Sequence, residues 1–559
     1  MLYKNSSVLR PKKTKIQPRN GSKYVYVVTG KTYHKEKKFY TETRKCVGVM
    51  IDDQHMMVNE YFKVYFPDEV VTYSNHLQYS KVVKVGATGV LKKIFEDLNI
   101  AKHLRMAFED TGDIDFDLPN TVFNLASYMI LEEKTAFQYF EHFRKNHYLM
   151  DSTITNDVDI CNYLKEKLSN KAKILDFNRS WFKDNVNNNH IYLSIDGTNV
   201  NNVSEGVTLK EYGHAKDNDD EPIVNLTYAF NQTNYRPLAY DIYKGSITDM
   251  AQINGFLKKI SDFGLEKVSL ILDRGYFSRK NIDAIMRKCA GFIMMVKDNN
   301  TIIKEKINEV LPIIASMKYH IEEHDVYGIT IYDKLFKQDS DAEKRYFHIY
   351  LDKKRQDVQS KKLLQNLKQQ LLLRQKEIGS IYNESYNNDY FEYQLDNNII
   401  KDVSLNYDAI DETCKRYGFF CIISSSQMTA EEALTTYRNR DEIEKIYRTL
   451  KSQLGLNSFY VQSNESLRGK AFIAFIATII RNELLQRLKE YKKKDHKNYT
   501  VPAALYELDD IESLYNSKGE YILDTELTLK QKNILEANGM KTSYFDEINK
   551  ELTDLVIQK

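Results

Sequence analysis

The sequence has few cysteines, almost no net charge and no long apolar segment. Its five cysteines are scattered and form no Cys-x-x-Cys pair, which argues against a disulfide framework and against a zinc knuckle. The longest apolar run, residues 471–480, is about half of the ~20 residues that a membrane span needs, and the N-terminus lacks the apolar core of a signal peptide. We therefore expect a soluble, cytoplasmic protein.

Charge is balanced overall but is unevenly distributed along the chain. The 80 Lys and Arg residues face 78 Asp and Glu residues, a net charge of +2, so the total charge does not indicate a polyanionic partner. Residues 1–50, however, contain 13 Lys and Arg against two acids, Glu36 and Glu42. Two interpretations of this basic segment stay open, a solvated tail or an arm that contacts phosphates. With 559 residues, three or more domains are expected.

The most informative stretch of the sequence runs from Tyr437 to Lys451. On a helix, Tyr437, Arg440, Glu444 and Lys451 are separated by three, four and seven residues and therefore share one face. A phenol, a guanidinium, a carboxylate and an ammonium on one face suit a site that holds a metal and a phosphate. An exposed charged helix with ordinary Glu–Lys pairs gives the same pattern.

Signals at both ends support a helix around this stretch. Thr429 with Glu432 three residues later is a capping box, and Gly455 is suited to end the helix. A second helix is predicted at 466–489, where apolar residues dominate.

Two upstream segments that are predicted as strands each finish in an aspartate. Asp196 follows Ile-Tyr-Leu-Ser-Ile, and Asp273 follows Val-Ser-Leu-Ile-Leu. Catalytic residues favour the carboxyl ends of strands in open α/β sheets, although an aspartate before Gly275 also suits a simple turn. Asp241 and Asp249 are alternative acids near the same strands.

The periodicity between residues 191 and 297 predicts an α/β core. Three strands are followed by a helix, a strand, a helix and a fifth strand. The predicted strands are 191–196, 223–230, 237–243, 267–273 and 291–297, and the helices are 248–260 and 279–288.

Outside this core, the patterns are mixed. Strands are predicted at 24–28, 43–52, 61–66, 327–334, 346–351 and 418–424, and helices at 90–98, 122–130, 160–168 and 357–378. The sequence from His320 to His324 fits the H-x-x-E-H pattern of some zinc peptidases, but its β-prone flanks argue against the long helix that such a site requires.

Three motifs in order give the chain a family resemblance. Asp-Gly at 196–197, Asp-Arg-Gly-Tyr at 273–276 and Tyr-x2-Arg-x3-Glu-x6-Lys at 437–451 resemble those of the DDE transposases of prokaryotic insertion sequences, in the branch that carries the last motif. The likeness covers roughly residues 190–300 and 415–490 and is fainter in the N-terminal part.

The resemblance implies an α/β fold with an RNase H-like catalytic core. A mostly β insertion domain is expected to interrupt this core, with an N-terminal α+β DNA-binding region and a helical C-terminal tail. The implied divisions are 1–185 for the basic region that binds DNA ends, 186–297 and 416–495 for the two parts of the core, 298–415 for the insertion and 496–559 for the tail.

The resemblance also implies the chemistry, cut-and-paste transposition. Asp196, Asp273 and Glu444 are the expected catalytic residues and metal ligands, while Tyr437, Arg440 and Lys451 are expected to bind DNA phosphates. Glu442 rivals Glu444 in the same helix, but two residues away it points to another face. Two Mg²⁺ ions, for which Mn²⁺ can substitute, would lie about 3.5 to 4 Å apart, with Asp196 bridging both and each other acid completing one.

The expected partners are double-stranded DNA, as inverted-repeat ends and as target, and a second copy of the chain in a dimer on DNA. In the family, end cleavage proceeds through a DNA hairpin. Two alternatives remain open, an RNase H-fold nuclease without strand transfer and an inactive DNA-binding relic.

Overall fold

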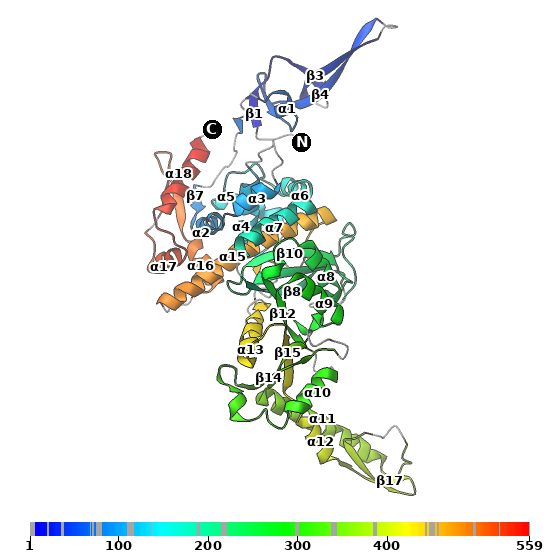
Figure 1. Ribbon diagram of the computed structural model, residues 1–559. Coiled ribbons are helices and arrows are strands. Elements are labelled where there is room, and N and C mark those ends of the chain that lie inside the picture. The colour runs from blue at the N-terminus through cyan, green and yellow to red at the C-terminus, as the bar shows by residue number, and fades with distance from the viewer. Residues whose placement is uncertain are drawn as a thin grey trace. The chain divides into compact units, whose positions relative to one another are not determined.

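The chain folds into two compact units. Unit 1 comprises Met1–Phe177, Ser204–Val207 and Leu450–Lys559, and unit 2 comprises Asn178–Val203 and Thr208–Thr449 (Figure 1). The computed structural model describes residues 6–19, 22–34, 38–67, 69, 72–73, 81–108, 117–134, 136–186, 190–213, 221–296, 301–336, 344–383, 388–441, 444–445, 453–455, 458–495, 499–524 and 526–557.

Unit 1 begins with a six-stranded sheet of order β2-β3-β4-β5-β1-β6. Its strands are β1 (Ser6–Leu9), β2 (Thr14–Arg19), β3 (Ser22–His34), β4 (Phe39–Met50), β5 (His55–Val58) and β6 (Thr72–Tyr73). The strand predicted at 61–66 is wrong, since α1 (Phe62–Tyr65) forms there. Asn59 causes the turn, because its side chain accepts from the Tyr61 amide and its carbonyl accepts from the Phe62 amide. Phe62 then fills the small core beneath the sheet.

Helices make up most of the remainder of unit 1, where the three predicted helices at 90–98, 122–130 and 160–168 are confirmed as α2, α4 and α6. The helices are α2 (Gly86–Asp97), α3 (Ile100–Phe108), α4 (Leu118–Glu132), α5 (Phe140–Asn146), α6 (Asp157–Glu166), α15 (Asn464–Asp495), α16 (Val501–Asp509), α17 (Leu529–Ala537) and α18 (Tyr544–Ile557), while α7 (Lys171–Val186) continues into unit 2. The apolar residues from Ala471 to Ile480 in α15 are fully buried. Among the described residues, no helix is long and apolar enough to cross a membrane.

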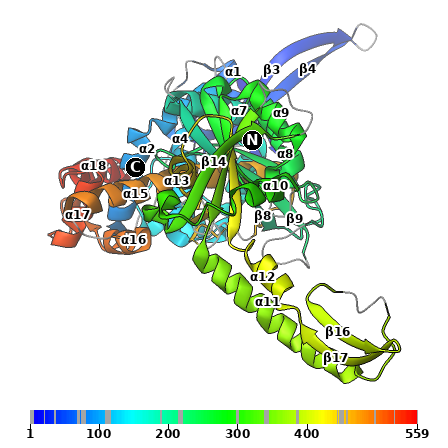
Figure 2. The same ribbon diagram turned by 60° about the horizontal axis from the view of Figure 1, so that its bottom comes forward.

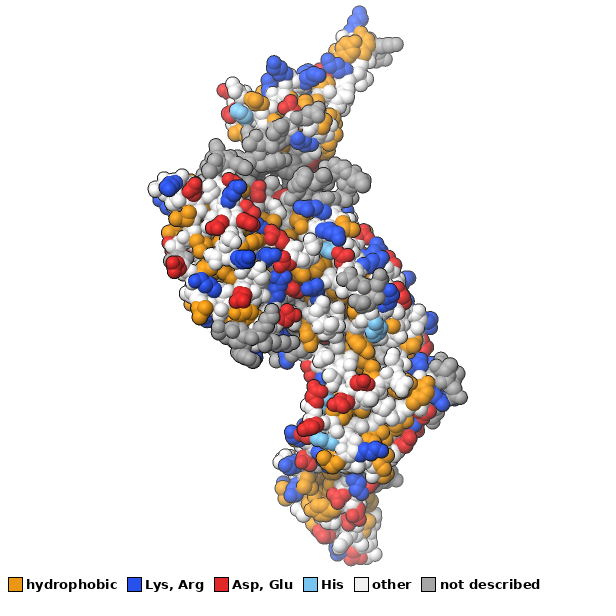
Figure 3. Space-filling model, turned by 60° about the vertical axis from the view of Figure 1, so that its left-hand side comes forward, with side chains coloured by type: hydrophobic (Ala, Val, Ile, Leu, Met, Phe, Trp, Pro, Cys, Tyr) orange, Lys and Arg blue, Asp and Glu red, His pale blue; other side chains and the backbone are white. Residues whose placement is uncertain are grey.

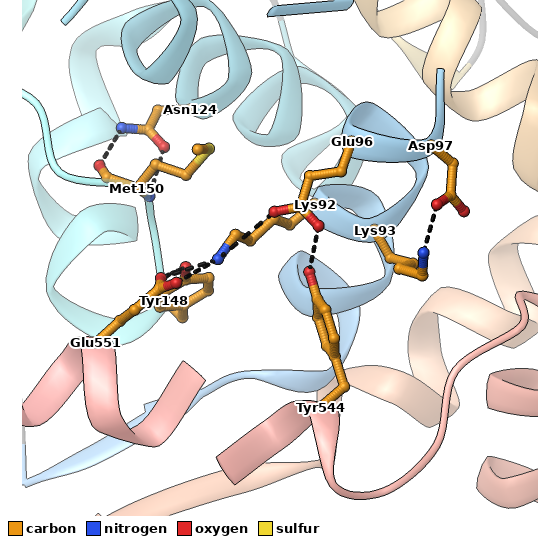
Figure 4. Close-up of polar contacts among 9 residues, drawn as sticks. All are labelled: Lys92, Lys93, Glu96, Asp97, Asn124, Tyr148, Met150, Tyr544 and Glu551. Carbon is orange, nitrogen blue, oxygen red and sulfur yellow. Dashed lines mark hydrogen bonds and ion pairs between the residues drawn. The ribbon is translucent and has the colours of Figure 1, made fainter. Parts of the chain in front are cut away.

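The C-terminal part, expected to be helical, also contains strands. Strand β19 (Glu512–Tyr515) pairs with β20 (Tyr521–Leu523) and with β7 (Val82–Lys84). Helix α18 is tied to α2 by polar contacts (Figure 4). The Lys92 ammonium, nearly buried, lies 2.7 Å from Glu551 Oε1, and the Tyr148 hydroxyl donates to the same carboxylate. Tyr544 donates to Glu96 at 2.9 Å. Helix α18 is thus part of the fold of unit 1.

A nine-stranded sheet forms the centre of unit 2, in the order β10-β9-β8-β11-β12-β18-β15-β14-β13. Strand β8 is parallel to β11 and β11 to β12, while the other neighbours are antiparallel. All five predicted core strands and both helices are confirmed. They are β8 (Ile191–Asn201), β9 (Ile223–Asn231), β10 (Pro237–Lys244), β11 (Val268–Leu272), β12 (Gly291–Val296), α8 (Asp249–Lys259) and α9 (Arg279–Lys288).

The segment predicted as an insertion domain, 298–415, divides between the sheet and a separate extension. Strands β13 (His320–Ile321), β14 (Val326–Lys334) and β15 (Lys344–Leu351) join the central sheet through β18 (Phe419–Ser424). Helix α11 (Lys353–Arg374) carries the β16–β17 hairpin (Phe391–Asp396 and Ile399–Leu405) at its far end (Figure 2). Leu367 of α11 packs on Phe391 and Leu405, whereas Ile378, the last residue of the helix predicted at 357–378, is exposed beyond the end of α11.

A buried histidine links three strands of this sheet. His348 of β15 has no exposed surface, and its ring nitrogens lie 2.9 Å from Ser424 Oγ and 2.9 Å from Thr330 Oγ1. Burial lowers the pKa of His348 to about 4. Between about pH 6.5 and pH 4, the unfolded chain therefore binds a proton at His348 that the folded protein does not bind.

The free energy of unfolding is accordingly expected to fall between about pH 6.5 and pH 4, by at most roughly 3 kcal/mol for this one group. Denaturant titrations at several pH values measure this slope. His348→Gln should flatten it, whereas His320→Gln, at a less buried position of the same sheet, should not. An equal slope in both variants would refute the assignment to His348.

Candidate active site

The two predicted aspartates lie on neighbouring parallel strands. In the register of β8 and β11, Val268 pairs with Ile191 and Ile271 with Ser194. Continuing this register by two residues places Asp273 beside Asp196, on the same face of the sheet. Neighbouring strands are about 4.8 Å apart, so the two carboxyl groups lie next to each other on adjacent strands.

The prediction that Asp196 ends its strand is wrong. Strand β8 runs on to Asn201, and Asp196 pairs with Tyr228 of β9. The strand continues because β9 remains as a partner after β11 has ended at Leu272. Asp196 therefore lies where the parallel half of the sheet stops.

Asp273 both starts a turn and stands at this edge, so the two interpretations of this residue are compatible. Its carbonyl accepts from the Tyr276 amide at 3.0 Å, and its carboxylate accepts from the Arg274 amide at 2.7 Å. The turn fixes the carboxylate directly after the buried strand β11.

Helix α13 (Ala430–Arg438) lies on the face of the sheet to which Asp273 belongs. Its predicted capping box is present, with Thr429 and Glu432 exchanging both hydrogen bonds. Leu434 and Tyr437 pack in one core cluster with Ile271 of β11. Because side chains alternate along a strand, Asp273 points to the same side as Ile271.

The predicted single helix is interrupted after α13. The regular helix ends at Arg438 and Asn439 forms a turn, after which Arg440, Asp441 and Glu444 are helical again. Lys451 and Glu442 lie outside the described residues, so the structure places neither of them.

Tyr437 and Arg440 both contact Asp273. The Tyr437 hydroxyl donates to Asp273 Oδ1 at 3.4 Å, and the Arg440 guanidinium lies 3.8 Å from the same oxygen. Arg440 also pairs with Glu444 at 2.5 Å and lies 5.4 Å from the centre of the Tyr437 ring. Arg440 thus links the glutamate helix to the aspartate edge of the sheet.

The electrostatics of this group follow from burial and from the three acids. Burial raises the pKa of the Tyr437 phenol, which therefore stays a proton donor, although Arg440 opposes the shift. Burial acts to lower the pKa of Arg440, but Tyr437, Asp273, Asp196 and Glu444 outweigh it and raise the pKa. The guanidinium is charged and interacts with all three acids.

The Nε–H donor of Arg440 is available to bind an anion. The residue is only 6% exposed, and its Nε has no hydrogen-bond partner among the described residues. A buried, charged donor without a partner is costly, and a phosphate oxygen is a group that would satisfy it.

The three acids are not assembled as a metal site in this structure. Among the described residues, no group of three or more His, Cys, Asp or Glu side chains is placed to hold a metal ion. The Arg440 guanidinium lies 3.8 Å from Asp273 Oδ1 and 2.5 Å from Glu444 Oε1, and it places a positive charge next to both acids. The carboxylate donors themselves fit a hard, oxygen-seeking divalent cation.

Of the alternative acids, Asp241 has polar partners of its own. It is paired with Lys259 at 2.6 Å and accepts from Gln252 at 2.7 Å. Asp249 begins α8, and its side chain is not described. The peptidase pattern is also not supported, because His320 and His324 lie in a two-residue strand and a single 3-10 turn, which lack the long helix of a zinc peptidase.

Sequence reasoning missed two residues of this site, Ser194 and Gln232. Both are buried polar residues of the central sheet, and Gln232 reaches the turn between α13 and Arg440. Neither stands in a recognisable motif, and only the pairing of β8 with β9 brings them together.

The mixed sheet, with parallel strands β8, β11 and β12 beside antiparallel β9 and β10, is consistent with an RNase H-like core, and the site at its edge is acidic. The chain belongs to the transposase DDE domain family, whose model matches residues 189–480. A cryo-EM structure of a piggyBac transposase synaptic complex with hairpin DNA is similar at 11% sequence identity and a TM-score of 0.34, over 83% of this chain and 84% of that one. No curated protein matches the chain.

Proposed function

We propose that this transposase belongs to the prokaryotic insertion-sequence branch and moves its own element by cut-and-paste transposition. It would cleave phosphodiester bonds at terminal inverted repeats and transfer the ends into target DNA. The contact of Arg440 with both Asp273 and Glu444 carries this proposal, because it unites two motifs that are distant in the sequence.

Asp196, Asp273 and Glu444 are the residues that would hold two Mg²⁺ ions, or Mn²⁺ in their place. Such a pair of ions activates the attacking oxygen and neutralises the leaving oxygen. The adjacent register of Asp196 and Asp273 supports this role. Glu444, whose carboxylate pairs with Arg440 in this structure, would be the third of these ligands.

Arg440 and Tyr437 are the proposed phosphate ligands, with Lys451 completing the set. The Nε of Arg440, which has no hydrogen-bond partner in the described part of the chain, supports the first of these roles. The high pKa of Tyr437 keeps its hydroxyl available as a donor beside Asp273. A DNA hairpin as the cleavage intermediate is part of the same proposal.

DNA-end binding is proposed for the N-terminal region, 1–185, and the β3–β4 hairpin supports it. In the described ranges, β3 beyond Val28 pairs with β4 alone, so the two strands form a two-stranded arm. Lys31 and Arg44 stand on this arm, where both pair with Glu42, and Tyr33 and Tyr40 near its tip are 47% and 65% exposed. Lys and Arg side chains lie along the arm in the space-filling view (Figure 3). Basic and aromatic side chains on a two-stranded ribbon suit a DNA groove and its phosphates.

The remaining divisions are proposed as functional regions. The two core parts, 186–297 and 416–495, would form the catalytic domain, and 298–415 its insertion. The tail, 496–559, is proposed for subunit contacts in a homodimer that pairs two DNA ends.

The test is to incubate the full chain and Mg²⁺ with DNA that carries the inverted repeats flanking its own coding sequence. We expect cleavage at the repeat ends and joining of those ends to a target duplex. Cleavage without joining would instead indicate an RNase H-fold nuclease. Binding without cleavage in either Mg²⁺ or Mn²⁺ would refute the catalytic proposal.

A further inference from the structure

Gln232 joins the aspartate strand to the glutamate helix. It follows β9 directly, is 6% exposed, and its backbone amide donates to the Tyr192 carbonyl of β8 at 2.9 Å. In the orientation that satisfies its neighbours, its side-chain oxygen accepts from Ser194 Oγ at 2.8 Å and from the Arg440 amide at 3.2 Å. Its side-chain nitrogen donates to the Thr436 carbonyl at 3.0 Å.

These two backbone groups are the ones that an unbroken helix would join. In an α-helix, the amide of residue 440 donates to the carbonyl of residue 436. Gln232 satisfies both groups with its carboxamide at the turn formed by Asn439. A side chain inserted into the helical hydrogen-bond ladder is a recognised cause of a kink.

We propose that Gln232 is a positioning residue of the active site, an inference whose catalytic consequence rests on the proposed transposase function. Its carboxamide sets the direction of the segment that carries Arg440 and Glu444. Ser194, which holds the carboxamide, lies two residues before Asp196 on the same face of β8. One side chain therefore couples the glutamate segment to the strand of the first aspartate.

Removing the carboxamide should redirect the glutamate segment. Gln232→Leu has a similar size but leaves the Thr436 carbonyl and the Arg440 amide without partners, and a buried unpaired group is costly. The helix satisfies both by forming the direct bond between them. We expect that closure to make the helix continuous through Asn439 and to turn Arg440 and Glu444 away from Asp273.

The experiment compares Gln232→Leu with Gln252→Leu in the full chain. Gln252 is the matched control, since it donates to Asp241 on the same sheet without touching the glutamate segment. Gln232→Leu should slow single-turnover end cleavage about 10²-fold and weaken Mn²⁺ binding roughly 10-fold or more. Gln252→Leu should retain both properties.

A third variant separates positioning from general destabilisation. Gln232→Glu keeps the acceptor for the Arg440 amide, but it donates to the Thr436 carbonyl only when protonated. Its cleavage rate relative to the wild type should therefore rise as the pH is lowered, while that of Gln232→Leu should not.

Equal cleavage and equal Mn²⁺ affinity in Gln232→Leu and Gln252→Leu would overturn the inference. Calorimetric Mn²⁺ titration of the DNA-free protein measures the role of Gln232 independently of transposition. If the wild type binds Mn²⁺ but cleaves no ends, the proposed function fails. The difference in Mn²⁺ affinity between Gln232→Leu and Gln252→Leu still tests whether Gln232 is a positioning residue.

Discussion

Glu444→Gln is expected to reduce cleavage of transposon ends by more than about 10³-fold, because the neutral amide is a poor ligand for the divalent ions of the proposed reaction. The substitution preserves the size of the side chain and keeps an oxygen that can accept from Arg440, its partner at 2.5 Å. Binding of DNA ends should therefore be unchanged. Gel-shift and single-turnover cleavage assays on the same DNA measure the two properties separately.

Glu431→Gln is the matched control for this experiment. Glu431 lies in the first turn of α13 and is exposed, so its neutralisation changes the charge of the same segment at a distance from Asp273. It should cleave like the wild type. Full activity of Glu444→Gln would remove Glu444 from the catalytic set, and equal losses in both variants would attribute the effect to the charge of the helix.

Arg440→Gln is expected to move metal binding and cleavage in opposite directions. The guanidinium lies against Asp273 and Glu444, so its removal takes away a positive charge that competes with a divalent ion. Mn²⁺ should bind about 10-fold more tightly, a change of about 1.4 kcal/mol. Cleavage should nevertheless fall by about 10²-fold, because the phosphate loses a charged donor.

Calorimetric Mn²⁺ titration and single-turnover cleavage test this opposition. Arg438→Gln, two residues earlier and only half-buried, is the control and should change neither property. Weaker Mn²⁺ binding in Arg440→Gln would show that Arg440 organises the carboxylates instead of competing with the metal. Unchanged cleavage would exclude Arg440 as a phosphate ligand.

Local patterns in the sequence predicted most of the core elements of unit 2. The apolar run Val268–Leu272 identified β11, and the Thr429–Glu432 capping box identified the start of α13, because each depends on neighbouring residues alone. The wrong predictions concern the ends of elements that depend on contacts with residues distant in the sequence. Strand β8 extends past Asp196 because β9 pairs with it.

The interruption of the helix after Arg438 has the same kind of cause. Residues 429–455 contain no proline, and the only glycine is Gly455, so the sequence predicts one continuous helix. Gln232 is distant in the chain and interrupts that helix with its side chain. A break made by an inserted side chain leaves no local signal.

The sequence by itself determined which acids and basic residues are candidates for the site, since Asp196, Asp273, Arg440 and Glu444 stand in recognisable motifs at fixed spacing. The tertiary structure decided how they meet. Parallel pairing of β8 with β11 sets the two aspartates side by side, and Arg440 bridges Asp273 to Glu444. Spacing along a chain fixes which residues share a face, whereas the distance between two elements depends on the register and packing that only the complete fold provides.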